Sequence, residues 1–216
     1  LSHLSQTLKQ DVFGASATGE PFEIAAGPVS LALSFEHRSE KVRGISDEGS
    51  QRGDWLSGNY RPTFGKFSVT EGALETVVPL AKGATWADTW DLQAAVRATD
   101  YSTAGYVTTW KVGTTYSPIP DIKLRVTRSR DIRAPNLQEL FAGGTSGSSV
   151  LLDPFTNTTP TVIGLTTGEL SLKPETADTT GVGVVLQPTM LSGFSASVDY
   201  WNIKIKGAIE VLASAS

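Results

Sequence analysis

The fold class is decided by residues 90–101, which read WDLQAAVRATDY. One parity of this stretch is mainly apolar and the other mainly polar: Trp90, Leu92, Ala94, Val96 and Ala98 against Asp91, Gln93, Arg97 and Thr99. Alternation with a period of two predicts a β-strand whose faces meet different environments. A helix, with about 3.6 residues per turn, would mix the two sets.

The same alternation recurs along the chain. It is clear in residues 29–38, 122–127, 182–187 and 194–200, and weaker in residues 106–116 and 5–14. Residues 67–80 change phase, because Phe67 and Val69 lie on one parity and Leu74 and Val78 on the other, which predicts a β-bulge near Gly72. We therefore expect an all-β antiparallel meander of about eight strands, each about 10 to 15 residues long. Ordinary globular strands have about 5 to 6 residues, whereas a strand crossing an outer membrane needs roughly 9 to 11.

The connections between these strands sort by length. Segments 83–88, 117–121 and 187–193 are short and rich in Gly, Pro or Ser, whereas 39–65 and 131–171 are long. Short and long connections fall at opposite ends of the strands, as in outer-membrane barrels. There are two exceptions: segment 100–105 is short but lies at the end of the long connections, and segment 15–27 is long but lies at the end of the short ones. Inside the longest connection, Asn136 and Glu139 have the spacing of a capping box, which predicts one helical turn at 135–141. Residues 143–147 are predicted to be a flexible loop.

Charged side chains on the polar strand faces predict the size of the barrel. They are Glu36, Arg38, Asp91, Arg97, Lys111, Lys123, Arg125, Asp199, Lys204 and Lys206. A small barrel has an interior packed with side chains, where unpaired ions would each cost several kcal/mol. A wide lumen removes this cost, so the strands are expected to form an arc of a much larger barrel. The alternative is a β-sandwich whose polar faces meet water.

Composition narrows the function classes. The chain has 216 residues, a net charge of −4 and no cysteine, which excludes a basic nucleic-acid surface, a disulfide scaffold and thiolate metal ligands. No run of about 18 apolar residues predicts a transmembrane helix. The chain starts with Leu1 and without a signal peptide, and it ends in Ala-Ser-Ala-Ser, so we expect a segment of a longer protein.

Four stretches resemble the barrel of TonB-dependent outer-membrane receptors. They are Gly27-Pro28 to Leu33 with Glu36-His37-Arg38, Glu75 to Leu80, Arg128 to Phe141, and Leu172-Lys173-Pro174-Glu175-Thr176 followed by Gly181 and residues 194–205. The third is the most specific, because it resembles the family's Arg-Ala-Pro…Glu-Leu-Phe signature before a long external loop. All four occur in the family's order.

The resemblance implies a barrel of about 22 strands, with residues 1–216 as a partial barrel domain in the outer membrane of a Gram-negative bacterium. It also implies a plug domain, energy supplied through TonB, and import of a scarce nutrient of the iron-siderophore, cobalamin or saccharide class. The plug and the TonB-contacting segment lie outside this chain.

Candidate ligand contacts occupy the two long connections. Arg128, Arg130 and Arg133 cluster where a strand enters a loop, and arginine forks favour anionic ligands. Trp55, Tyr60 and Arg61 in the other loop could bind a ligand by stacking. The alternatives are an electrostatic network at the barrel rim for the arginines and an ordinary loop anchor for the aromatic residues. Trp86, Trp90, Trp110, Tyr106, Tyr116 and Tyr200 are predicted to form interfacial girdles against lipid.

Other functions have less support in the sequence. The two histidines, His3 and His37, lie in different strands without a third ligand, so no metal site is expected. No acid, base and nucleophile constellation predicts an enzyme, and no motif predicts a cofactor. A secreted adhesion or binding module remains the alternative function. It would need loops of similar length at both ends of the strands.

Overall fold

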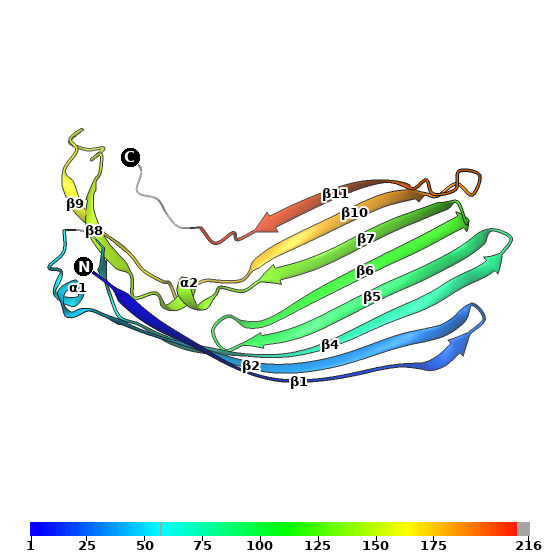
Figure 1. Cartoon of the computed structure of the whole chain (residues 1–216), viewed down its shortest axis with the longest axis horizontal. Coiled ribbons are helices and arrows are strands. Elements are labelled where there is room, and N and C mark those ends of the chain that lie inside the picture. The colour runs from blue at the N-terminus through cyan, green and yellow to red at the C-terminus, as the bar shows by residue number, and fades with distance from the viewer. Residues whose placement is uncertain (57, 211–216) are drawn as a thin grey trace.

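The computed structural model describes residues 1–56 and 58–210, which form one curved antiparallel sheet with a smaller sheet at one end (Figure 1). The large sheet has eight strands in the order β1-β2-β4-β5-β6-β7-β10-β11. Their bounds are Leu4–Ile24, Gly27–Ser46, Thr63–Ala84, Ala87–Tyr101, Gly105–Ile119, Ile122–Arg133, Glu175–Leu186 and Ala196–Lys206. Each strand pairs with the next one of the large sheet, which confirms the predicted meander. No second sheet faces this one within the described residues, so the sandwich alternative is wrong.

Connection lengths differ between the two ends of the sheet (Figure 1). At the turn end, residues 25–26, 85–86, 120–121 and 187–195 join consecutive strands. At the loop end, residues 47–62 and 134–174 form long connections, and 102–104 form a short one. The expected long segment at 15–27 is wrong, because β1 continues to Ile24 and pairs with β2 up to that residue, with one register shift between Gly19 and Phe22. The predicted asymmetry is therefore stronger in the structure than in the sequence.

The two faces of the sheet differ in polarity along the middle of the strands. We call the face that carries Glu75, Gln93 and Lys111 the inner face, because a hollow of about 640 Å³ lies on it. The opposite, outer face carries exposed apolar side chains, among them Leu33, Phe35, Leu74, Val96, Val112, Val126, Val182 and Val198. So broad an exposed apolar surface requires a lipid or protein environment. This set is the outer belt.

Aromatic side chains mark the turn end of the outer belt. Trp90 makes edge contacts at 5.9 Å with both Trp86 and Tyr116. The polar atoms are satisfied locally, since Trp90 Nε1 donates to Thr114 Oγ1 at 2.8 Å and Tyr116 Oη donates to the Trp86 carbonyl at 2.7 Å. Such rings, apolar in body and polar at the tip, suit an interface between lipid and water.

The loop end carries its own small structures. Helix α1 (Glu48–Arg52) and β3 (Asn59–Tyr60) lie in one long connection, and α2 (Leu137–Phe141), β8 (Thr145–Val150) and β9 (Thr161–Thr166) lie in the other. The predicted helical turn is confirmed as α2. The flexible loop predicted at 143–147 is wrong, because its second half begins β8, which pairs with both β9 and β3.

The phase change in residues 67–80 has a different cause from the predicted bulge. Pairing between β2 and β4 runs without interruption through Gly72, and the register shifts instead between Pro79 and Ala81, against β5. Phe67 and Val69 point to the inner face, where they pack with Leu140 of α2. The apolar residues change parity because the environment changes along the strand. In the middle of β4 they belong to the outer belt, whereas near the loop end they lie on the inner face and pack against α2.

One charge pair crosses the inner face between non-adjacent strands. Arg125 of β7 reaches Asp199 of β11 over β10, with Nε donating to Oδ1 at 2.8 Å. This contact needs Gly183 between them, because a Cβ there would lie 2.0 Å from Asp199 Oδ1. Lys204 and Lys206 were expected on the same face as Asp199. That expectation is wrong, because Lys204 pairs in register with Asp178 on the outer face.

Candidate ligand-binding surface at the loop end

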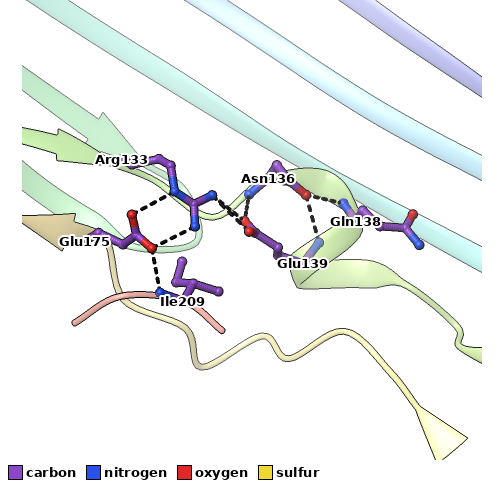
Figure 2. Close-up of polar contacts among 6 residues, drawn as sticks. All are labelled: Arg133, Asn136, Gln138, Glu139, Glu175 and Ile209. Atoms are coloured by element: carbon purple, nitrogen blue, oxygen red, sulfur yellow. Dashed lines mark hydrogen bonds and ion pairs between the residues drawn. The ribbon is translucent and has the colours of Figure 1, made fainter. Parts of the chain in front are cut away.

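Helix α2 is fixed at its start by a complete capping box. Asn136 Oδ1 accepts from the backbone N–H groups of Gln138 and Glu139, both at 2.9 Å, and Glu139 Oε2 accepts from the Asn136 N–H at 2.8 Å (Figure 2). The helix lies against β4, and Gly65 makes this approach possible: a Cβ there would lie 2.0 Å from the Phe141 ring. Leu140 is buried against Phe67 and Val69. The longest loop is thus anchored on the inner face.

Arg133 ties this loop to the sheet (Figure 2). Its guanidinium donates to both oxygens of Glu175, at 2.9 Å each, and to both oxygens of Glu139, at 2.9 and 3.0 Å. Glu175 also accepts from the Ile209 backbone N–H at 2.5 Å. Hydrogen bonds from Arg133 lower the pKa of Glu175, which lies at the strand end well beyond the outer belt, to about 2. One guanidinium therefore joins the end of β7, α2 and the start of β10, and through Glu175 the segment after β11.

The three predicted arginines do not converge. Arg128 and Arg130 lie on the outer face, whereas Arg133 lies on the inner face. Arg130 pairs with Asp178, its Nε donating to Oδ1 at 2.8 Å, and Arg128 donates to the Thr180 hydroxyl. These contacts fit the alternative of an electrostatic network at the rim.

Trp55 anchors the other long loop. Its indole N–H donates to Asp47 Oδ1 at 3.2 Å, and its backbone N–H donates to Asn59 Oδ1 at 3.0 Å. Asp47 also caps α1 by accepting hydrogen bonds from the Ser50 backbone N–H and hydroxyl. In addition, it accepts one from the backbone N–H of His3, before β1. These hydrogen bonds, that from the Ser50 side chain foremost, hold the pKa of Asp47 well below its usual range. The Trp55 contacts are those of a loop anchor.

Tyr60 and Arg61 lie where the two long loops meet. Tyr60 pairs with Thr145 in the small sheet, and the Arg61 N–H donates to the Gly144 carbonyl at 2.9 Å. The Arg61 side chain is exposed and forms no ion pair with the residues that the structure describes. Tyr60 lines a recess of about 280 Å³ whose other polar walls are Thr63, Gln138, Glu139, Thr145, Thr166 and Thr167. Residues with hydroxyl and amide side chains line this recess, which suits a polar ligand bound by hydrogen bonds, whereas the Glu139 carboxylate is already held by Arg133.

Within the described range, no group of three or more His, Cys, Asp or Glu side chains is placed to hold a metal ion. Among the described residues, 1–56 and 58–210, no helix is long and apolar enough to span a membrane.

Comparison with known proteins identifies the family. The model of the TonB-dependent receptor-like β-barrel matches residues 26–216. The chain belongs to this family. Its members are receptors and transporters rather than enzymes. A comparison with curated protein sequences found no match.

Solved receptor barrels share the fold. The siderophore receptor PirA of Acinetobacter baumannii is similar with a TM-score of 0.68 and 20% identity. The ferric enterobactin receptor PfeA of Pseudomonas aeruginosa, in a complex with enterobactin, is similar with a TM-score of 0.69 and 17% identity. In both cases the alignment covers 93% of this chain and 27% of the larger receptor. The receptor barrel described here thus spans about a quarter of the length of these relatives.

Sequence reasoning missed several residues that build this end of the receptor barrel. The carboxylates of Glu175, Glu139 and Asp178 were not predicted to pair with the arginines. The sequence does carry a signal that the arginines diverge, since Arg130 and Arg133 lie on opposite parities of one strand and cannot share a face. The contact between Tyr60 and Thr145 had no sequence signal, because the two residues lie in different loops.

Proposed function

We propose that residues 1–216 are one arc of the outer-membrane barrel of a TonB-dependent receptor that imports a scarce nutrient. The observation that carries this proposal is the outer belt, an exposed apolar surface on strands of 11 to 22 residues whose sequence matches the receptor-barrel family. Strands β1 and β11 have one unpaired edge each in the described sheet, and neighbouring barrel strands would complete them. Unpaired strand edges are not tolerated in lipid, so the arc requires the rest of the receptor.

The plug domain and TonB are the expected partners, through parts of the receptor outside this chain. Iron-siderophore complexes are the first nutrient class to test, because the similar receptors PirA and PfeA are siderophore receptors by name. Cobalamin and saccharides are the other classes. The test is uptake of labelled ferric siderophore, cobalamin and oligosaccharide by cells that carry or lack the intact receptor. Uptake of one class should require both the receptor and TonB. Equal uptake of every class with and without the receptor would contradict the proposal.

We propose that the loop end faces the outside of the cell and the turn end faces the periplasm. The long connections and the polar recess lie at the loop end, where a nutrient would first arrive. Cysteines placed at Ser148 of β8 and Ser192 of the β10–β11 connection test this, because both side chains are exposed. An impermeant maleimide should label only the first on whole cells. Ser117 is unsuitable as a reporter, because it is 3% exposed. Labelling of Ser192→Cys alone would invert the orientation.

For the ligand contacts we rank the six predicted residues by their placement. Tyr60 and Arg61 come first, since Tyr60 lines the recess, Arg61 follows it and donates its backbone N–H to Gly144 of the recess wall, and the Arg61 guanidinium has no carboxylate partner in the described chain. Trp55 and Arg133 come next, because their polar groups are engaged in anchoring loops. Arg128 and Arg130 come last, because they point away from the lumen. Arg61→Ala should weaken ligand binding to the intact receptor about tenfold, the loss expected for one charge-assisted hydrogen bond, while Arg128→Ala should leave it unchanged. The reverse result would overturn the ranking.

A further inference from the structure

The recess lined by Tyr60 has walls that hydrogen bonds hold in place. The Gly143 N–H donates to Thr63 Oγ1 at 3.0 Å, which ties the loop after α2 to the start of β4. Thr63 has the same parity on β4 as Phe67, which packs under α2, so this wall belongs to the inner face. The recess is therefore a preformed hollow at the loop end, on the side of the sheet that faces the lumen.

Two adjacent glycines allow the two long loops to approach closely enough to form the recess. A Cβ on Gly143 would lie 2.0 Å from the Pro62 carbonyl oxygen, and a Cβ on Gly144 would lie 2.4 Å from the Thr166 carbonyl oxygen. Gly144 also has a φ of 99°, which residues with a side chain rarely adopt. The Gly143-Gly144 pair therefore builds the recess, where the sequence alone predicted a flexible loop.

The recess carries no uncompensated charge. Within the part of the chain that the structure describes, no lysine, arginine or histidine lines it, and its carboxylate is that of Glu139. Glu139 accepts hydrogen bonds from Arg133 at 2.9 and 3.0 Å and from the Asn136 N–H at 2.8 Å. An anion bound here would lose water without gaining a cation, which is costly in a partly enclosed site. An uncharged ligand avoids this cost.

The polar side chains of the recess have hydrogen-bonding capacity that the protein does not use. Those that form no side-chain hydrogen bond with any described residue are Tyr60, Gln138, Thr145, Thr166 and Thr167. A hydroxyl group can both donate and accept, and so can an amide. The hydroxyl groups of a ligand match this mixture because they also do both, whereas an anion only accepts.

The volume of the recess limits the ligand to about one ring. It encloses about 280 Å³, just below the roughly 300 to 1,000 Å³ of pockets that take a drug-sized ligand. Tyr60 adds a half-buried aromatic ring, apolar in body and polar at its tip, to the hydroxyl-bearing wall. A sugar ring has the complementary surface, with apolar C–H faces and hydroxyl groups around its edge. A ferric siderophore, in which several chelating arms surround the metal, exceeds this space.

We propose that the recess binds one uncharged, hydroxyl-rich ring of the imported nutrient, namely a sugar ring of a neutral saccharide. This inference rests on the proposed import function and narrows its nutrient class. The hydroxyl groups of the sugar exchange hydrogen bonds with Gln138, Thr166 and their neighbours in the wall, and a C–H face of the sugar packs on the Tyr60 ring.

The test measures binding of oligosaccharides to the intact receptor in detergent. The probes are matched pairs of neutral and uronic-acid oligosaccharides, which differ only by a carboxylate in place of a hydroxymethyl group. A neutral member should bind, and its acidic partner should bind about tenfold more weakly, because the carboxylate finds no cation in the recess.

Threonine substitutions locate the binding in the recess. Thr166→Val combined with Thr167→Val should weaken binding of the neutral oligosaccharide about tenfold, since each neutral hydrogen bond contributes about threefold. The matched control is Thr159→Val combined with Thr161→Val, which changes exposed threonines of the same loop outside the recess and should alter the affinity less than about twofold. Heat-modifiable mobility on gels verifies that both variants are folded.

A charge introduced into the recess should reverse its preference. Gln138→Lys places a cation beside the bound ring, so affinity for the uronic-acid oligosaccharide should rise about tenfold while affinity for the neutral one changes less than about threefold. An unchanged ratio of the two affinities in this variant would place the ligand elsewhere.

Three further results would overturn the inference. They are equal affinity of the unaltered receptor for the acidic and neutral members of every pair, equal affinity of the Thr166/Thr167 variant and the unaltered receptor, and TonB-dependent import of a ferric siderophore without affinity for any neutral oligosaccharide. The last result would leave the proposed import function standing. A receptor that binds a neutral oligosaccharide in the recess but imports no nutrient would instead contradict the proposed function and leave the assignment of the recess standing.

Discussion

The middle of the sheet and its loop end have opposite polarity. In the middle, the outer face is apolar and the inner face carries Glu75, Gln93 and Lys111. At the loop end of the same strands, the outer face carries exposed lysines of β1, β2 and β4, and the inner face is apolar because Phe67 and Val69 pack under α2. The strand backbone is continuous through both regions. A change of hydrophobic phase along a long strand can therefore mark the border between two environments rather than a bulge.

The greatest loss of stability is expected in the middle of the sheet, where two adjacent alanines of β5 lie on opposite faces. Ala94 of β5 pairs in register with Val112 of the outer belt, whereas Ala95 pairs with Glu75 on the inner face. Ala94→Arg in the intact receptor should destabilise the fold by about 2 to 4 kcal/mol, the cost of a cation against lipid near the midplane. Ala95→Arg should cost far less, since its guanidinium can reach water and Glu75. Equal losses in unfolding experiments in lipid would contradict the assignment of faces.

A smaller loss of stability is expected at the loop end, where the inner face is apolar and the outer face is charged. Phe67→Ala should loosen the docking of α2 and cost about 2 kcal/mol, less than in a large core because the cluster is small. Lys66→Ala, one residue away on the outer face, should have almost no effect. Hydrogen exchange across residues 134–174 of the intact receptor measures the difference. Increased exchange in the Lys66 variant but not in the Phe67 variant would reverse the inferred faces.

A smaller effect compares the two arginine pairs on opposite faces of β7. Arg133→Ala should raise exchange several-fold in α2 and at the start of β10, because one guanidinium joins both segments. Arg130→Ala should act only beside Asp178 and leave α2 unchanged. If both variants loosened α2 to the same degree, the Arg133 network would not be its anchor.

The smallest effect depends on pH and concerns α1. Hydrogen bonds lower the pKa of Asp47 in the folded chain, so its capping contribution is present above the unfolded value of about 3.9 and is lost as the pH falls through the folded value. Protection of residues 48–53 from exchange should therefore decline below about pH 4. Asp47→Asn keeps the acceptor oxygen without the charge and should flatten this dependence, whereas Glu48→Gln should preserve it. An unchanged pH profile in the Asp47 variant would assign the decline to other groups.

Alternation by itself determined most of the fold. The eight strands, the meander, the outer and inner parities of β5 and the single turn of α2 were predicted from residues 90–101, their repeats and the Asn136–Glu139 spacing. These features are local, because a strand's two faces and a helix cap are set by residues two or three positions apart. The resemblance to receptor barrels rested on four short motifs, and the family comparison confirmed the resemblance.

The assembly of the loop end depends on contacts between segments that are distant in the sequence. Register placed Arg128 and Arg130 outside and Arg133 inside, aligned Lys9 with Lys41 and Lys66, and brought Tyr60 to Thr145. None of these pairings can be read from one strand, because each depends on the alignment between strands or on the path of a long loop. The sequence could not separate a bulge near Gly72 from packing under α2, since both produce the same shift in apolar parity. The cause is α2, which lies some 70 residues further along the chain and packs on Phe67. Its docking depends on burial between distant segments rather than on local propensity.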